Sequence, residues 1–121
     1  MRYYAGIDIG STASKVVVLG ENGMEDRFVL PTGWSSKETA REIAARLASG
    51  GHPPGADMRV VATGYGRISV DYADKTVTEI SCHGRGGWQL LGRDCTVIDI
   101  GGQDTKVITV ENGLPTSFLM N

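Results

Sequence analysis

Two stretches of the sequence each combine an aspartate, a glycine turn, short polar side chains and a lysine. Residues 7–18 align without gaps on residues 98–109, and half of the aligned positions are identical, including the aspartate, the first glycine and the lysine. Glycine lets the backbone approach a ligand closely, and successive N–H groups of such a turn can bind an anion. An aspartate beside the turn can hold hydrated magnesium, which keeps most of its waters in proteins. Each stretch therefore predicts a site for phosphate and magnesium.

Asp8 and Asp99 are the predicted magnesium-holding residues, and Ser11, Thr12 and Ser14 add hydroxyl groups at the first turn. One copy alone is explained by an ordinary hairpin with an aspartate at a strand end, because Asp-x-Gly turns are common. The repetition favours phosphate binding, since a second carboxylate with polar neighbours has no obvious packing purpose. If a pseudo-twofold axis relates the copies, the two turns face each other across a cleft that fits a nucleoside triphosphate.

Each copy is expected to form three strands. An Asn-Gly pair follows both stretches, at residues 22–23 and 112–113, and this pair is a strong hairpin signal. The order in each half is strand, glycine turn, strand, Asn-Gly turn, strand. Each aspartate lies between two isoleucines, so its side chain should point to the face opposite the isoleucine pair.

The segment between the copies changes to a helical period. Ser35 and Glu38 form a predicted capping box, and apolar residues at helical spacing continue to Gly50. Residues 59–63 predict a short strand. Thr76 with Glu79 predicts a second capped helix that ends near residue 91, although it contains three glycines, which are poor helix formers. The order βββαβα followed by βββ predicts an α/β fold with a mixed sheet.

Composition excludes several classes of protein. The chain has 121 residues, 40% of them hydrophobic, 21% charged, and a net charge of −2, so it is neither a disordered chain nor a basic nucleic-acid binder. No apolar run approaches the roughly 18 residues of a membrane span. Cys82 and Cys95 are too few and too isolated for a disulfide framework or a complete metal site within one chain, and they fit a reducing, cytoplasmic compartment.

At these turns the sequence resembles the superfamily of acetate and sugar kinases, heat-shock chaperone ATPases and actin, whose two phosphate loops open two duplicated ribonuclease-H-like lobes. More narrowly, it resembles the activator ATPases of 2-hydroxyacyl-CoA dehydratases, which are related to the ATPase subunits of benzoyl-CoA reductase. The narrower resemblance rests on residues 62–67 (Ala-Thr-Gly-Tyr-Gly-Arg), 79–83 (Glu-Ile-Ser-Cys-His), 103–104 (Gln-Asp) and 120–121 (Met-Asn).

The resemblance implies an actin-type ATPase lobe at residues 1–94 and the beginning of a second lobe, with its phosphate loop, at residues 95–121. It also implies a cytoplasmic homodimer that binds ATP or ADP with magnesium, holds a four-iron, four-sulfur cluster between subunits, and drives one electron into a dehydratase. Asp8, Asp99 and Gln103 would be catalytic, with both aspartates holding magnesium through water. The residues implied to hold phosphates are Gly10, Ser11, Thr12, Ser14 and Lys15 on one side and Gly101, Gly102 and Gln103 on the other.

The family's cluster cysteines have no counterpart here, so the sequence is expected to be the first part of a longer activator. Such a piece would expose an apolar face and strand edges at residues 95–121 and would self-associate through them. Two alternatives remain: a kinase that transfers phosphate to a small molecule, and an isolated lobe without catalysis.

Other residues carry simpler expectations. Lys106 is expected on a solvated face, Glu79 is explained by its cap, and His83 is expected to be packed or at the surface. Cys82 and Cys95 are expected to be core thiols, and Trp34 and Trp88 to pack. Asp104 is assigned equally to magnesium or to the turn, and Arg67 has no assigned role.

Overall fold

The computed structural model describes residues 2–55 and 57–121 and divides the chain into two compact units, Met1–Thr76 and Val77–Asn121. The first unit contains β1 (Tyr3–Ile9), β2 (Ala13–Gly20), β3 (Gly23–Pro31), α1 (Ser36–Ser49), β4 (Met58–Thr63), a short 3-10 helix (Arg67–Ser69) and β5 (Lys75–Thr76). The second contains α2 (Glu79–Leu91), β6 (Cys95–Ile100), β7 (Thr105–Glu111) and β8 (Leu114–Met120).

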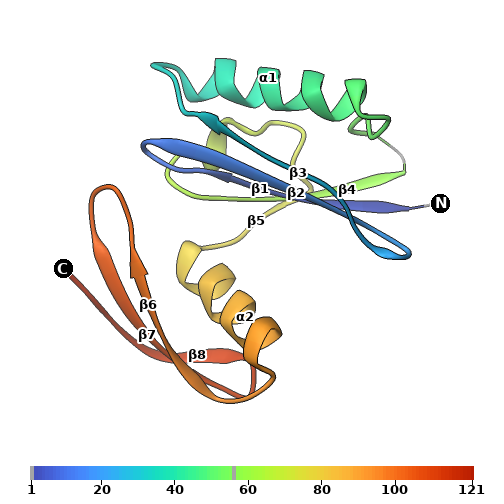
Figure 1. Ribbon diagram of the computed structural model, residues 1–121. Coiled ribbons are helices and arrows are strands. Elements are labelled where there is room, and N and C mark those ends of the chain that lie inside the picture. The colour runs from blue at the N-terminus through green and yellow to red at the C-terminus, as the bar shows by residue number, and fades with distance from the viewer. Residues whose placement is uncertain (1, 56) are drawn as a thin grey trace. The chain divides into compact units, whose positions relative to one another are not determined.

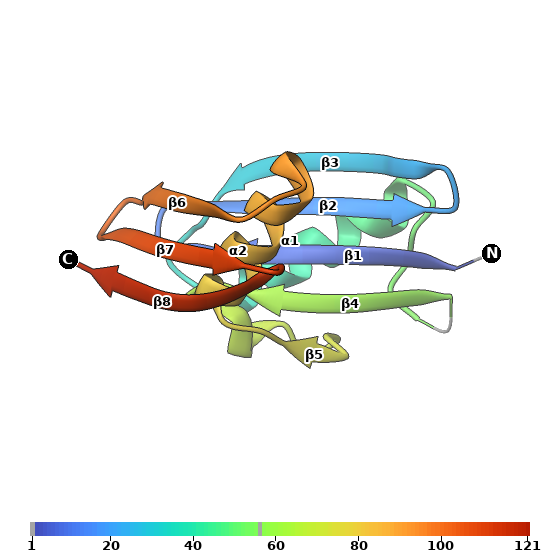
Figure 2. The same cartoon turned by 90° about the horizontal axis from the view of Figure 1, so that it is seen from below.

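The first unit is a five-stranded mixed sheet with α1 on one face (Figure 1). Its strand order is β3-β2-β1-β4-β5, which Figure 2 shows along the sheet. β1 is antiparallel to β2 and parallel to β4, so the mixed sheet is confirmed. Alternate residues of the strands pack under α1, and the core includes Ile7, Ile9, Val16, Ile43 and Leu47. Because side chains alternate between faces, Asp8 points away from that core, as predicted.

The first helix begins and ends where its sequence signals lie. Ser35 Oγ accepts a hydrogen bond from the Glu38 N–H at 3.3 Å, and Gly50 follows the last helical residue. The second helix is also present, but its cap differs from the prediction. Thr78, and not Thr76, accepts the bond from the Ser81 N–H, because Thr76 lies in β5.

The second unit packs α2 on an antiparallel sheet in the order β6-β7-β8. One of the helix glycines, Gly87, makes this close packing possible, because a Cβ there would lie 2.6 Å from Val97 Cγ2. A Cβ on Gly84 would lie 3.6 Å from the Pro115 ring, an ordinary contact distance, and Gly86 faces open space. Gly87 therefore lowers helix propensity but lets the helix approach the sheet closely.

The unit boundary falls before α2, whereas the sequence places the helix in the first lobe and the lobe boundary at 94/95. The reason is that α2 packs on β6, β7 and β8, a tertiary contact that no local signal encodes. The lobe boundary at 94/95 stays a prediction.

The uncovered face of the second sheet is apolar. It carries the exposed side chains of Ile98, Ile100 and Leu119. In the first unit the residues equivalent to Ile98 and Ile100 are Ile7 and Ile9, which are buried under α1. The expected exposed apolar face is thus present. Neither helix of the described residues has the length and apolarity that crossing a membrane requires.

Candidate functional site

The first glycine turn joins β1 to β2 and is closed by backbone hydrogen bonds. The Gly10 N–H donates to the Ala13 carbonyl at 3.1 Å, and the Thr32 N–H donates to the Thr12 carbonyl at 2.9 Å. A Cβ on Gly10 would lie 2.8 Å from the Ala13 oxygen, so the tight turn requires glycine here. Ser11 and Thr12 are exposed at its tip. The turn therefore offers backbone and hydroxyl groups to a ligand from a fixed position.

Asp8 stands beside this turn between two neighbours on the face away from α1. Its cross-strand partner on β2 is Lys15, whose Nζ lies 3.6 Å from Asp8 Oδ2, and its partner on β4 is Thr63. The Lys15 side chain is about half exposed. Its ammonium also lies near the turn, since a Cβ on Gly10 would be 3.5 Å from Lys15 Nζ. A cation is thus held over the turn by a carboxylate while remaining open to a ligand.

The loop after β4 closes the other side of Asp8. Gly64 has a φ of +92°, and a Cβ at this position would overlap Asp8 Oδ1. The Gly66 N–H donates to the Ile9 carbonyl at 2.9 Å, and Arg67 Nη1 donates to the Gly64 carbonyl at 3.0 Å. Arg67, to which the sequence assigned no role, therefore braces the loop that encloses the Asp8 carboxylate.

Ser14 lies in a different environment from Ser11 and Thr12. Its side chain is completely buried under α1, and Ser14 Oγ is 2.6 Å from Thr32 Oγ1. The hydroxyl links β2 to the end of β3 and is turned away from the Asp8 face. Its position is therefore that of a structural hydroxyl beneath the turn.

The second glycine turn, between β6 and β7, has the same backbone closure. The Gly101 N–H donates to the Asp104 carbonyl at 2.9 Å, and Gly101, Gly102 and Gln103 are exposed. Asp99 pairs across strands with Lys106, as Asp8 does with Lys15, and Asp99 Oδ2 is 3.7 Å from Lys106 Nζ. The repeat seen in the sequence is therefore a repeat of strand register, turn closure and ion pair.

The two lysines nevertheless differ in environment. The Lys106 side chain is only 7% exposed and lies under α2, so the expectation of a solvated lysine is wrong. Lys106 Nζ is 2.8 Å from Asp104 Oδ1 and 3.5 Å from Glu79 Oε2, besides Asp99. The hydrogen bond to Asp104 raises the pKa of Lys106, and the nearby carboxylates of Glu79 and Asp99 raise it further against the opposing effect of burial.

His83 and Glu79 join the second turn from α2. His83 Nδ1 lies 3.6 Å from Asp99 Oδ2. The carboxylate of Glu79, which the sequence explained by the helix N-cap alone, forms an ion pair with Lys106. The sequence missed this cluster because its members come from a helix and two strands. The spacing of Glu79 and His83 on one helix face is the signal that points to it.

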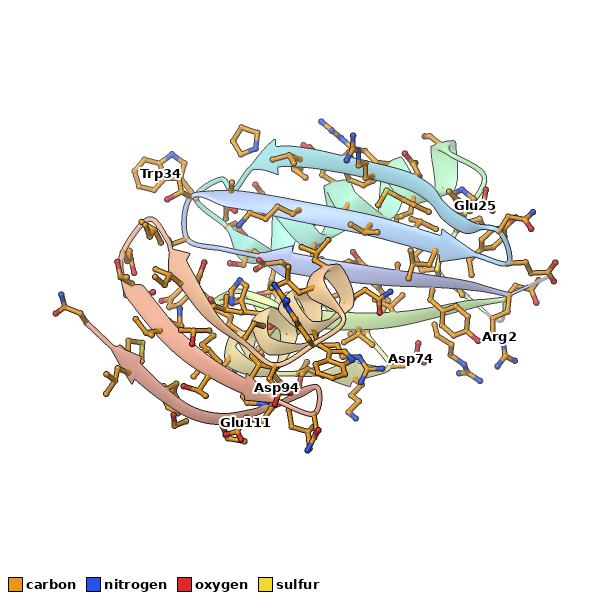
Figure 3. The ribbon with its side chains drawn as sticks, turned by 60° about the horizontal axis from the view of Figure 1, so that its bottom comes forward. Arg2, Glu25, Trp34, Asp74, Asp94 and Glu111 are labelled. Atoms are coloured by element: carbon orange, nitrogen blue, oxygen red, sulfur yellow. The ribbon has the colours of Figure 1, made fainter. Side chains whose placement is uncertain are left out.

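The cysteines and tryptophans occupy ordinary positions, with one exception. Cys82 and Cys95 are free and half-buried, on α2 and β6 respectively. Trp88 packs over Gly113, as expected. Trp34 is fully exposed between β3 and α1, so its predicted packing is wrong (Figure 3). Across residues 2–55 and 57–121, no three His, Cys, Asp or Glu side chains lie close enough to hold a metal ion directly.

Comparison with known proteins places these turns in a family. Residues 5–121 match the BadF/BadG/BcrA/BcrD ATPase family. The chain is 46% identical to the (R)-2-hydroxyglutaryl-CoA dehydratase activating ATPase of Acidaminococcus fermentans, over 98% of this chain and 46% of that protein.

Solved structures agree with this match. The crystal structure of component A of the A. fermentans (R)-2-hydroxyglutaryl-CoA dehydratase superposes with a TM-score of 0.87 at 43% identity, over 100% of this chain and 48% of that one. The activator of 2-hydroxyisocaproyl-CoA dehydratase from Clostridium difficile, with bound ADPNP, gives 0.82 at 40% identity, over 98% and 45%. The ethanolamine utilization protein EutJ of Carboxydothermus hydrogenoformans shares the actin-like fold, with a TM-score of 0.75 at 16% identity, over 100% and 52%.

The chain spans about half the length of these relatives. Its match covers both glycine turns and nearly every described residue. The duplicated turns, the actin-like fold and the family match agree, and the chain belongs to the BadF/BadG/BcrA/BcrD ATPase family.

Proposed function

We propose that the protein containing this chain binds and hydrolyses magnesium ATP, and that it activates a 2-hydroxyacyl-CoA dehydratase by ATP-driven electron transfer. The observation that carries the proposal is the repeated turn with its Asp–Lys pair, in a chain 46% identical to a dehydratase activating ATPase. The bound ADPNP in the C. difficile relative supports the nucleotide. The resemblance also implies a cytoplasmic homodimer, and both belong to the proposal.

The first turn has the features of a phosphate-binding loop. Lys15 is exposed, lies over the turn, and is paired with a single carboxylate, so a phosphate oxygen can approach its ammonium. Gly10 permits the tight turn, and the exposed Ser11 and Thr12 supply backbone N–H groups and hydroxyls at its tip. Positioning and charge neutralisation of this kind are the main contributions that proteins make to phosphoryl transfer.

The second turn differs because its lysine is already neutralised. Three carboxylates surround Lys106, so the turn retains net negative charge and favours a cation over a second phosphate at that point. Gly101, Gly102 and Gln103 are the residues exposed to a ligand, and the resemblance implies that they contact phosphate, with Gln103 also catalytic.

The donor set fits hydrated magnesium. Asp8 Oδ1 is buried without a hydrogen-bond partner, and carboxylates that act through water are typical of magnesium sites. Asp8 and Asp99 would hold the ion through its waters, and the bound ion would neutralise charge on the transferred phosphate. The carboxylates themselves would orient those waters.

The described residues do not fit an iron–sulfur cluster. Cys82 and Cys95 are the two cysteines of the sequence, both are free and half-buried, and neither is at a position to which the resemblance assigns a cluster ligand. No step of the proposal is therefore assigned to a cluster bound by these residues.

The test uses the protein expressed from its complete gene. Calorimetric titration with magnesium ATP should show binding, and the addition of protein, ATP and a reductant should activate the dehydratase of the same organism. Asp8→Asn and Asp99→Asn should each slow hydrolysis by about 100-fold or more while changing ATP affinity less, because the carboxylates act on magnesium and water.

Glu21→Gln is the matched control, since it removes an exposed carboxylate in the β2–β3 turn, away from Asp8. It should leave the rate unchanged. No heat at millimolar magnesium ATP would overturn nucleotide binding, and equal hydrolysis by wild type and both aspartate variants would overturn the assignment of the carboxylates.

A further inference from the structure

Two neighbouring polar atoms, on the face of the first sheet away from α1, are buried without a hydrogen-bond partner. Asp8 Oδ1 and Thr63 Oγ1 both lack a hydrogen bond, and Asp8 and Thr63 are directly opposite each other on the parallel strands β1 and β4. Thr63 is 8% exposed. Because paired residues of neighbouring strands point to the same face, both side chains are on the side away from α1.

The surroundings of Asp8 Oδ1 and Thr63 Oγ1 offer these atoms few hydrogen-bond partners from the protein. Asp8 Oδ2 is directed to Lys15, whereas Asp8 Oδ1 lies against the backbone of Gly64. The loop is fixed by the bond from the Gly66 N–H to Ile9, so it cannot easily turn a donor inward. Native proteins rarely leave such groups unpaired, and those that remain call for a ligand or a bound water.

We propose that Thr63 is a positioning residue of the first turn. Its hydroxyl and Asp8 Oδ1 together hold one water molecule, which donates a hydrogen bond to the carboxylate and accepts one from the threonine. This gives the Asp8 carboxylate a second fixed partner opposite Lys15. The effect of the pair on hydrolysis rests on the proposed ATPase function, because the water would lie where Asp8 orients the hydrated magnesium ion.

A purely structural Thr63 would behave differently on substitution. Valine has nearly the same shape and lacks only the hydroxyl, so packing is retained while the water loses one partner. Serine keeps the hydroxyl and loses a methyl group. The pair Thr63→Val and Thr63→Ser therefore separates the hydroxyl from the shape of the side chain.

The chain offers a matched control in Thr39, which is 6% exposed and lies in the same unit. Its hydroxyl donates to the Ser35 carbonyl at 3.1 Å and accepts from the Gly33 N–H at 3.3 Å. Thr39→Val removes bonds that are formed within the protein and should lower the Tm. Thr63→Val removes a hydroxyl that has no direct protein partner and binds only the proposed water, so it should lower the Tm of the nucleotide-free protein less than Thr39→Val does.

The experiment measures kcat, KM and Tm of these variants in the protein expressed from its complete gene, and the electron density at Asp8 in a high-resolution crystal structure. We expect Thr63→Val to lower kcat by about tenfold at similar KM, Thr63→Ser to restore it, and Thr39→Val to keep kcat while losing Tm. Density for a water between Asp8 and Thr63 is expected in the wild type and not in Thr63→Val.

Two results would overturn the inference. The first is a Thr63→Val enzyme with wild-type kcat, or a loss that serine does not restore. The second is a well-ordered wild-type crystal structure without a water at these two atoms. If the wild type does not hydrolyse ATP, the proposed function fails, and the crystal density still decides whether Asp8 and Thr63 share a water.

Discussion

Replacing Gly64 by alanine should damage the first turn through a contact with Asp8. The new Cβ would overlap Asp8 Oδ1 and lie 2.5 Å from the Ile9 carbonyl oxygen, and the φ of +92° is one that alanine rarely adopts. The left-handed conformation costs about 1–2 kcal/mol. Overpacking against backbone that cannot move freely adds about 1–3 kcal/mol. The expected loss in the free energy of unfolding is therefore about 2–5 kcal/mol.

The control for backbone conformation is Gly23→Ala. Gly23 has a φ of +104°, but a Cβ there meets nothing within 4 Å. It should lose only the conformational part, about 1–2 kcal/mol. Urea unfolding measures both losses, and titration with magnesium ATP measures the effect on binding. Equal losses for Gly64→Ala and Gly23→Ala would refute the contact with Asp8.

Four further substitutions test the remaining interactions. Lys106→Met should cost about 1–3 kcal/mol at pH 7, because it leaves the carboxylates around Lys106 without their cation. Since the folded pKa of Lys106 is raised, its contribution is fully present below the ordinary value of 10.5 and is lost at higher pH, so wild type and variant should converge in urea unfolding at alkaline pH. Gly86→Ala should stabilise α2 by roughly 0.5–1 kcal/mol, because its Cβ would face open space. Gly87→Ala should destabilise the protein, because its Cβ would displace Val97. Equal Tm values for the two variants in thermal melts would contradict the packing of α2. Burial, together with the charge of Asp71, raises the pKa of Tyr72 from 10.0 to about 12, so the free energy of unfolding of the wild type should fall between these pH values. Tyr72→Phe lacks the hydrogen bond to the Ala40 carbonyl, so its free energy of unfolding should be about 1 kcal/mol lower at neutral pH. It should then depend less on pH above 10 than that of the wild type, as measured by urea unfolding.

Local signals predicted the strands and helices because their causes are local. The Asn-Gly pairs both mark hairpins, although the turns differ in detail. Asn112 and Gly113 both have positive φ and form the two-residue loop, whereas at the first hairpin only Gly23 does, as the first residue of β3. The same dipeptide therefore gives the turn, while its position in the strand pair sets the turn type.

The site was only partly predictable. Asp8, Asp99 and the turn glycines were found because they repeat. Thr63 and His83 were not identified as site residues, since strand pairing and helix packing bring them to the aspartates from distant parts of the sequence. The exposed position of Trp34 was missed for the same reason, because an aromatic side chain packs only where a neighbouring element covers it.

The sequence by itself determined the register of each hairpin and therefore the Asp–Lys pairing. Asp8 and Lys15 have the same separation as Asp99 and Lys106, and a short turn between two strands makes such residues cross-strand neighbours. Only the tertiary structure decided what each pair became. The α1 helix covers the isoleucine face and leaves Lys15 open, whereas α2 covers the aspartate face and buries Lys106 among carboxylates. Side chains alternate between the two faces of a strand with the same spacing, so this spacing does not decide which face a helix covers. That depends on the packing of helices that are distant in the sequence.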